Sequence, residues 1–166
     1  MNNQLPKRKS IRLSQYDYSQ NGAYFITICT KDRRCVLSHV VGRGLAPAVL
    51  ELTDYGKIAE QELLSLEQRY PSVKVDTYVI MPNHIHVLFA IENETAGASP
   101  RPTISDVVCA YKSLTTRRCR CGKLFQTSFH DHVIRNQADY DDIYRYIENN
   151  PLQWELDELY NGQPEL

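Results

Sequence analysis

Residues 79–90, VIMPNHIHVLFA, predict two strands joined by a tight turn. The Pro-Asn pair is a turn signal, and apolar and β-branched residues precede and follow it. Neighbouring side chains of a strand point to opposite faces of its sheet, so His84 and His86 share one face. The core is expected on the other face, where three apolar residues lie: Ile85, Val87 and Phe89. Both imidazoles should then lie on the open face of the sheet, a few ångströms apart and in position to hold one metal ion.

A bare His-x-His pair is weak evidence for a metal site, because two histidines on a strand are more often ordinary half-exposed positions. A second pair, His130 and His132, shows how readily the pattern arises. A metal site therefore needs a third ligand and a reactive group from elsewhere in the chain.

Periodicity and turn residues predict the remaining elements. Helices are expected over 53–69, from Thr103 or Ser105 to residue 119, and from residue 137 to residue 150, the last capped by Asn136 and stopped by Pro151. Strands are expected over 23–30, 73–81, 84–91 and 123–135, with a short strand within 35–41, whereas 42–52 and 92–102 are predicted to be loops. The resulting order is typical of an α+β fold with a ferredoxin-like or RRM-like antiparallel sheet, helices on one face and an added C-terminal helix.

The C-terminal helix has the residues to complete a site on the open face of the sheet. One stripe of this helix is expected to pack against the protein: Tyr140, Ile143, Tyr144 and Ile147. Tyr146 and Asn150 lie side by side on the flank of that stripe, one turn apart. A helix laid across the sheet would bring a phenol and an amide oxygen to the two imidazoles.

Length and composition indicate one cytoplasmic domain. The chain has 166 residues, 42% of them hydrophobic, which suits a single core. No apolar run approaches the ~20 residues of a membrane span, and the polar start MNNQLPKRKS lacks the apolar centre of a signal peptide. Five cysteines without paired C-x-x-C spacings indicate reduced thiols and not a disulfide framework or a standard zinc site.

The net charge of −1 conceals a segregation of charges along the chain. Residues 136–166 hold eight acids, whereas the N-terminal segment and residues 101–135 are basic. Such runs are often only solvated surface, but together they predict a basic face and an acidic tail.

Several separated motifs, in the same order, resemble the single-tyrosine HUH transposases, specifically their REP-associated branch. The motifs are IRLSQYDYSQNGAYFITICTKDRR, PNHIHVL, KSLTTRR and HDHVIRNQADYDDIYRYIENNPLQWEL. They cover nearly the whole chain. The resemblance implies that residues 1–166 form one HUH transposase-like domain, with a basic arm over about 1–20 and an acidic tail over about 152–166.

The resemblance also implies chemistry at named residues. His84 and His86 would bind Mg²⁺ or Mn²⁺, Asn150 would complete the metal site, and Tyr146 would be the nucleophile. The expected activity is metal-dependent nicking and strand transfer of single-stranded DNA at hairpin or REP-type sequences, through a 5′-phosphotyrosine. A phenolate leaves phosphorus more readily than an alkoxide does, so a DNA 3′-hydroxyl can reverse the linkage without ATP.

Single-stranded or hairpin DNA is the expected partner, with no membrane partner, and the protein would be associated with the nucleoid. The resemblance is compatible with a homodimer or a monomer. Basic and aromatic residues are expected to contact the DNA, and the candidates are Lys7, Arg8, Lys9, Tyr111, Lys112, Arg117 and Arg118.

Two alternatives remain at this stage. One is a domesticated relative that nicks hairpins without moving itself. The other is an RRM-like module that binds single-stranded nucleic acid on the same sheet face and does no chemistry. The combination of His84, His86, Tyr146 and Asn150 favours an enzyme, since a binding module has no need of it.

Overall fold

The structure is a computed structural model that describes residues 21–42, 48–92 and 102–161. Its centre is a four-stranded antiparallel sheet in the order β4-β5-β1-β6. The strands are β1 (Gly22–Cys29), β4 (Val73–Ile80), β5 (His84–Ile91) and β6 (His130–Val133). The two strands of the VIMPNHIHVLFA stretch pair as predicted, and the α+β ferredoxin-like fold is confirmed.

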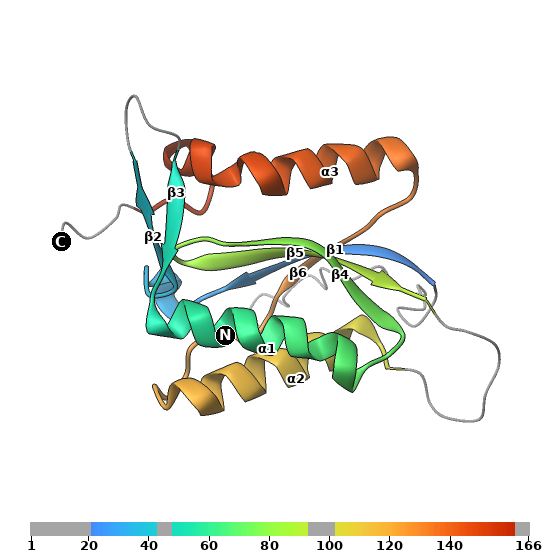
Figure 1. Cartoon of the computed structure of the whole chain (residues 1–166), viewed down its shortest axis with the longest axis horizontal. Helices are drawn as coiled ribbons and strands as arrows, with labels where there is room; N and C mark the ends of the chain where they lie inside the picture. Colours follow the sequence, from blue (N-terminus) through green and yellow to red (C-terminus); the bar gives the residue numbers. More distant parts are fainter. Residues whose placement is uncertain (1–20, 43–47, 93–101, 162–166) are drawn as a thin grey trace, which may run out of the picture.

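Two helices cover one face of this sheet and a third covers the other, as Figure 1 shows. The first two are α1 (Asp54–Arg69) and α2 (Ile104–Cys119), and the third is α3 (Gln137–Asn149), followed by a 3₁₀ segment, η2 (Asn150–Leu156). Each α-helix begins after a capping side chain that accepts a backbone N–H: Thr53, Thr103 and Asn136. All three helices therefore start within about two residues of the predicted positions.

The sheet has a core on each face. Below it, towards α1 and α2, lie the fully buried Ile85, Val87 and Phe89 of β5, as the alternation predicts. Above it, Leu88 of β5 packs in a smaller cluster with Ile147 of α3 and Trp154 of η2. The face that carries His84 and His86 is thus covered and not open.

A separate two-stranded hairpin stands at one end of the sheet (Figure 1). It comprises β2 (Ser38–Val41) and β3 (Val49–Leu52), so the prediction of a loop across 42–52 is wrong for its last four residues. The last strand of the main sheet is also shorter than predicted: only 130–133 pair, with one isolated bridge between Thr30 and Phe125 further back. The hairpin lies against α1 at Gly56, where any side chain would collide with the carbonyl of Leu37.

None of the helices in the described ranges is long and apolar enough to cross a membrane.

Candidate active site and metal centre

The site lies between the start of β5 and the end of α3. His84 and His86 point to the α3 side, with ring centroids 4.4 Å apart. The sequence predicted an open face for both, but their side chains are 0% and 3% exposed. Trp154 of η2, whose ring centroid is 5.8 Å from that of His84, helps to bury them.

Each imidazole is oriented through its Nδ1 atom. His84 Nδ1 donates to Asn83 Oδ1 at 2.8 Å, and His86 Nδ1 lies 2.8 Å from the hydroxyl of Thr27 on β1. The Asn83 amide is fixed in turn, because its Nδ2 donates to the carbonyl of Leu159 at 2.8 Å. This arrangement leaves the Nε2 lone pairs for a ligand, as at metal sites where the second ring nitrogen is held by a neighbour.

Burial keeps both rings neutral. It lowers the pKa of His84 below its usual value, and it lowers the pKa of His86 well below that value, with the neighbouring His84 adding to the effect. Neutral imidazole is the form that binds a metal.

The chain after α3 supplies two further groups, Asn150 and Asp157. Asn150 Nδ2 donates to Asp157 Oδ2 at 2.9 Å, while the backbone N–H of Leu159 donates to Asp157 Oδ1 at 2.7 Å. One ligand atom each from His84, His86 and Asp157 lies within 4.8 Å of the others. Strand β5 and the chain from Asn150 to Asp157 therefore converge on one point.

A divalent cation fits this set of donors. Among the described residues, nothing donates a hydrogen bond to the buried His84 Nε2 or to the buried Asn150 Oδ1. Buried acceptors normally have a hydrogen-bond donor, so these two unpaired atoms are compatible with a bound cation. Imidazole nitrogen with carboxylate and amide oxygen is a donor set that suits Mn²⁺ and, less well because of the nitrogens, Mg²⁺.

Tyr146 of α3 lies beside this cluster. Its ring packs edge-on against Phe25 and near His86, with centroid distances of 6.1 and 5.2 Å. Its hydroxyl lies 3.3 Å from His86 Nε2 and donates to Asp157 Oδ2 at 3.2 Å. Burial, and then the charge of Asp157, raise the pKa of Tyr146 to about 12, so it is a neutral phenol. The side chain is nevertheless 41% exposed, which leaves a reacting molecule a way in.

Three comparisons relate the chain to known proteins. No family model matches it. A protein of Haemophilus influenzae is 33% identical over 92% of this chain and 93% of its own length. The two proteins belong to one family.

This chain is also similar to transposases, in sequence and in fold. The REP-associated tyrosine transposase of Escherichia coli is 23% identical to this family member, over 82% of this chain and 70% of the relative. A solved structure of a REP-associated tyrosine transposase bound to a REP hairpin superposes with a TM-score of 0.64, at 22% identity, covering 88% of this chain and 77% of that one. The shared architecture is therefore the α+β transposase fold.

The predicted DNA contacts of the protein described here fall into three groups. Lys7, Arg8 and Lys9 lie outside the described residues. Lys112 and Arg117 lie on the outer side of α2, where they line a pocket.

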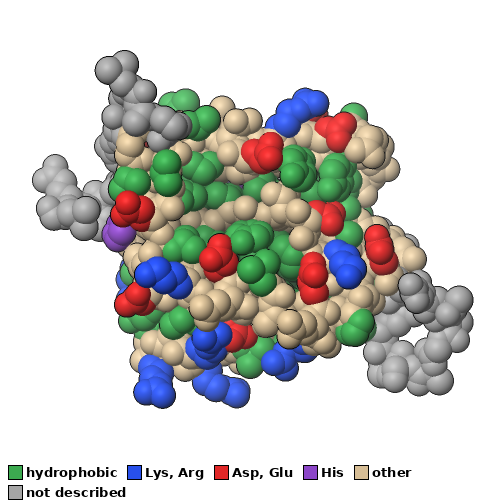
Figure 2. Space-filling model, viewed as in Figure 1, with side chains coloured by type: hydrophobic (Ala, Val, Ile, Leu, Met, Phe, Trp, Pro, Cys, Tyr) green, Lys and Arg blue, Asp and Glu red, His purple; other side chains and the backbone are tan. Residues whose placement is uncertain are grey.

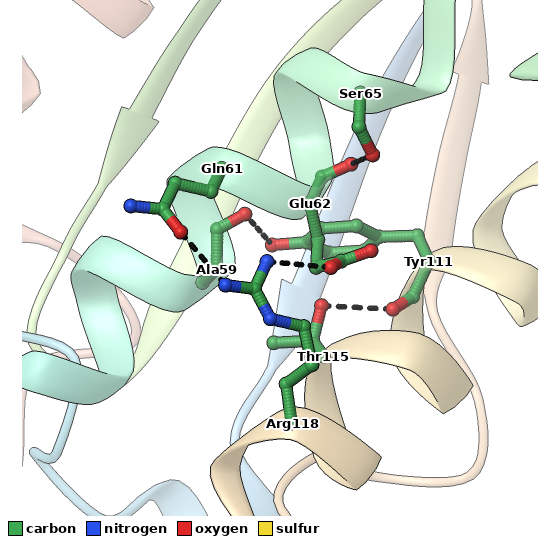
Figure 3. A network of polar contacts seen from close by, with 7 residues as sticks. All are labelled: Ala59, Gln61, Glu62, Ser65, Tyr111, Thr115 and Arg118. Atoms are coloured by element: carbon green, nitrogen blue, oxygen red, sulfur yellow. Dashed lines mark hydrogen bonds and ion pairs between the residues drawn. The ribbon is translucent and has the colours of Figure 1, made fainter. Parts of the chain in front are cut away.

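Tyr111 and Arg118, the third group, do not line this pocket. Tyr111 is 0% exposed and its hydroxyl donates to the carbonyl of Ala59 at 3.1 Å, so its prediction as a DNA contact is wrong. Arg118 reaches across to α1, where its guanidinium binds Glu62 at 2.7 Å and Gln61 at 2.8 Å (Figure 3). Both side chains join the two helices.

Sequence reasoning missed Asp157. It appeared only as one of eight acids in the C-terminal stretch, with no spacing that ties it to the histidines. Its position depends on η2, which turns the chain back after Pro151 so that residue 157 returns to the sheet.

Proposed function

We propose that this protein is a metal-dependent enzyme that nicks single-stranded DNA and transfers the strand, with Tyr146 as nucleophile. The observation that carries the proposal is the position of the Tyr146 hydroxyl, 3.3 Å from His86 Nε2 and 3.2 Å from Asp157 Oδ2. His86 and Asp157, two of the three residues whose ligand atoms cluster within 4.8 Å, thus contact the Tyr146 hydroxyl.

In the proposed reaction, the Tyr146 oxygen attacks a phosphate of the DNA backbone. A bond forms between phosphorus and the phenolic oxygen, and the bond to the 3′ oxygen breaks, which leaves a 5′-phosphotyrosine and a free 3′-hydroxyl. Because the phenol is neutral, its proton must leave as the bond forms, and the Asp157 carboxylate is in contact to take it. The same proton then passes to the departing 3′ oxygen, which becomes the 3′-hydroxyl. The reverse attack by a 3′-hydroxyl rejoins the strand.

His84, His86, Asp157 and Asn150 would hold the cation. A bound Mn²⁺ or Mg²⁺ would offset the negative charge that develops on the phosphate oxygens. The protein's own contribution is to bury the ligands, hold their tautomers through Asn83 and Thr27, and place the phenol beside them.

The substrate class is supported by the relatives. A structure with the same fold is bound to a REP hairpin, and the E. coli relative is a REP-associated transposase. We infer that this protein acts on hairpins of the same kind, and so at the nucleoid.

The test is covalent trapping of a labelled hairpin DNA on the protein in Mn²⁺, resolved on a denaturing gel. Wild-type protein should form an adduct, and Tyr146→Phe should bind the hairpin equally well but form none, since it lacks only the attacking oxygen. Tyr140→Phe and Tyr144→Phe are matched controls, because both rings pack on the α3 stripe and stack on each other at 6.2 Å. An adduct on Tyr146→Phe, or its mapping to Tyr140 or Tyr144, would reject the assignment, and binding without any adduct would indicate a binding module.

A further inference from the structure

A second concave site lies on the other side of the sheet from Tyr146. It is a pocket of 440 Å³ between the outer side of α2 and residues 123–127, which lead into β6. Its lining includes three cations and no acid: Lys112, Arg117 and Lys123. Most of the other lining residues carry hydroxyl or amide groups: Ser113, Thr116, Gln126 and Thr127. On the face of the molecule in Figure 2, Lys and Arg side chains likewise gather on the half formed by α1 and α2.

The two lysines of the pocket are held in place without being neutralised. Lys112 Nζ donates to the carbonyl of Thr127, and Lys123 Nζ to the hydroxyl of Thr127, both at 2.8 Å. An ammonium has three donors, so each lysine keeps two for a ligand. Arg117 is exposed, and its guanidinium has no ion pair within the described ranges. The site is therefore positively charged and polar, which suits an anion with many oxygen acceptors.

The pocket is close to the Tyr146 site along the sheet. The backbone N–H of Gln126 donates to the carbonyl of Cys29 on β1, and Cys29 pairs with His84 on β5. Gln126 and His84 thus flank β1, separated by two strand spacings, or about 10 Å. The pocket and the candidate metal centre lie at the same end of the sheet, one on each side of it.

The edge between them is polar. β6 is an edge strand, and its His130 lies opposite Thr27, whose hydroxyl contacts His86. Cross-strand partners point to the same face of a sheet, so His86, Thr27 and His130 form a row that runs from the metal centre to the edge. The row ends at the edge of the sheet in the exposed side chain of His130.

Building on the proposed function, we propose that the pocket binds the sugar-phosphate backbone of the DNA strand that Tyr146 cuts, next to the scissile phosphate. Its three cations match successive phosphates, and its hydroxyl and amide groups match the sugar and ester oxygens. The pocket then determines which phosphate reaches Tyr146.

The test is the salt dependence of binding. Affinity for fluorescent oligo-dT is measured in EDTA, so that no cleavage is involved, for the wild type and for the double variant Arg117→Gln/Lys123→Gln. Each lost phosphate contact should flatten the slope of log affinity against log salt by ~0.7, or about 1.4 in total. The control Lys57→Gln/Lys74→Gln removes two exposed cations from α1 and from the opposite edge strand, β4, and should keep the wild-type slope.

A substitution that adds a positive charge should change the slope in the opposite direction. Ser113 is exposed at the pocket, so Ser113→Arg should steepen the slope by ~0.7. Equal slopes for the pocket and control double variants, or no binding of oligo-dT by the wild type, overturn the proposal.

The adduct assay separates this proposal from the proposed function. If Tyr146 forms the adduct normally and the pocket double variant keeps the wild-type slope, only the proposal about the pocket is rejected. Flattened slopes without any adduct reject the phosphotyrosine chemistry, and with it the role of the pocket beside a cut phosphate, but keep the pocket as a DNA-binding site.

Discussion

Asn83 links the candidate metal ligand His84 to the C-terminal part of the chain. Its Oδ1 accepts from His84 Nδ1, and its Nδ2 donates to Leu159 O and to Asn161 Oδ1. The side chain thereby selects the tautomer in which His84 Nε2 has a free lone pair. Asn83 is therefore a positioning residue, which acts on the metal through the histidine.

Replacing Asn83 should weaken metal binding without removing a ligand. We expect Asn83→Ala to bind Mn²⁺ about 10–100-fold more weakly, the usual cost of losing such a partner. Calorimetry or Mn²⁺ electron paramagnetic resonance would measure this in the absence of DNA. Asn149→Ala is the control, since that amide is exposed and, among the described residues, donates to the carbonyl of Arg145. Equal affinities for the two variants would show that Asn83 does not position His84.

The sequence predicted which residues of this site lie next to one another, but not how deeply they are buried. Alternation along β5 was enough to put His84 and His86 on the same face, and helical spacing was enough to put Tyr146 beside Asn150. The burial of both histidines was not predictable, because it depends on Trp154 and the turn of η2. For the same reason, His84→Ala is expected to destabilise the fold and not only to impair metal binding.

At the scale of elements, α2 uses its two sides differently. One side packs on α1 through Tyr111 and Arg118, and the other carries Lys112 and Arg117 at the pocket. The sequence indicated only that this helix is basic. The position of Glu62 on α1 was needed to separate Arg118, which pairs with it, from the basic residues at the pocket. Glu62 is 8% exposed, so its carboxylate depends on Arg118 for a partner.

Arg118 should therefore matter for stability and not for DNA binding. We expect Arg118→Ala to lower the free energy of unfolding by about 1–3 kcal/mol, because it leaves a nearly buried carboxylate without its donor. Urea denaturation would measure the loss, with Arg117→Ala as the control, which should be close to neutral. A flattened salt dependence of oligo-dT binding for Arg118→Ala, with unchanged stability, would contradict this role.

The elements themselves were largely predictable, and the exceptions have physical causes. Capping residues and apolar periodicity locate all three α-helices closely, because both signals are local. β3 was missed because its four residues follow a Gly/Pro-containing segment and become a strand only by pairing with β2. The prediction of a long last strand was wrong because the chain touches the end of β1 at only one bridge, between Phe125 and Thr30, and pairs regularly with β1 only from residue 130.

At the scale of the whole molecule, the candidate metal centre joins the middle of the chain to its C-terminal part. His84 and His86 come from β5, whereas Asn150 and Asp157 come from η2 and the residue after it. A cation bound at this point would connect the sheet to the segment that covers it.

Metal should for this reason stabilise the entire fold. A ligand that binds only the native state at 100 times its dissociation constant adds about 2.7 kcal/mol to the free energy of unfolding. We expect Mn²⁺ to raise the melting temperature of wild-type protein and EDTA to reverse the rise. Tyr146→Phe should respond as the wild type does, and His86→Ala should not. A melting temperature that is independent of Mn²⁺ would argue against the centre.

The chain order of these ligands has a consequence for how the protein comes into being. Synthesis proceeds from the N-terminus, so both histidines and the tyrosine are made before Asp157. The hydrogen bonds that orient His84 are also incomplete until Leu159 and Asn161 have joined Asn83. A partly synthesised chain, or one clipped before residue 157, would carry the nucleophile without a complete centre. If the proposed function holds, only chains whose synthesis has passed residue 157 are expected to cut a DNA strand.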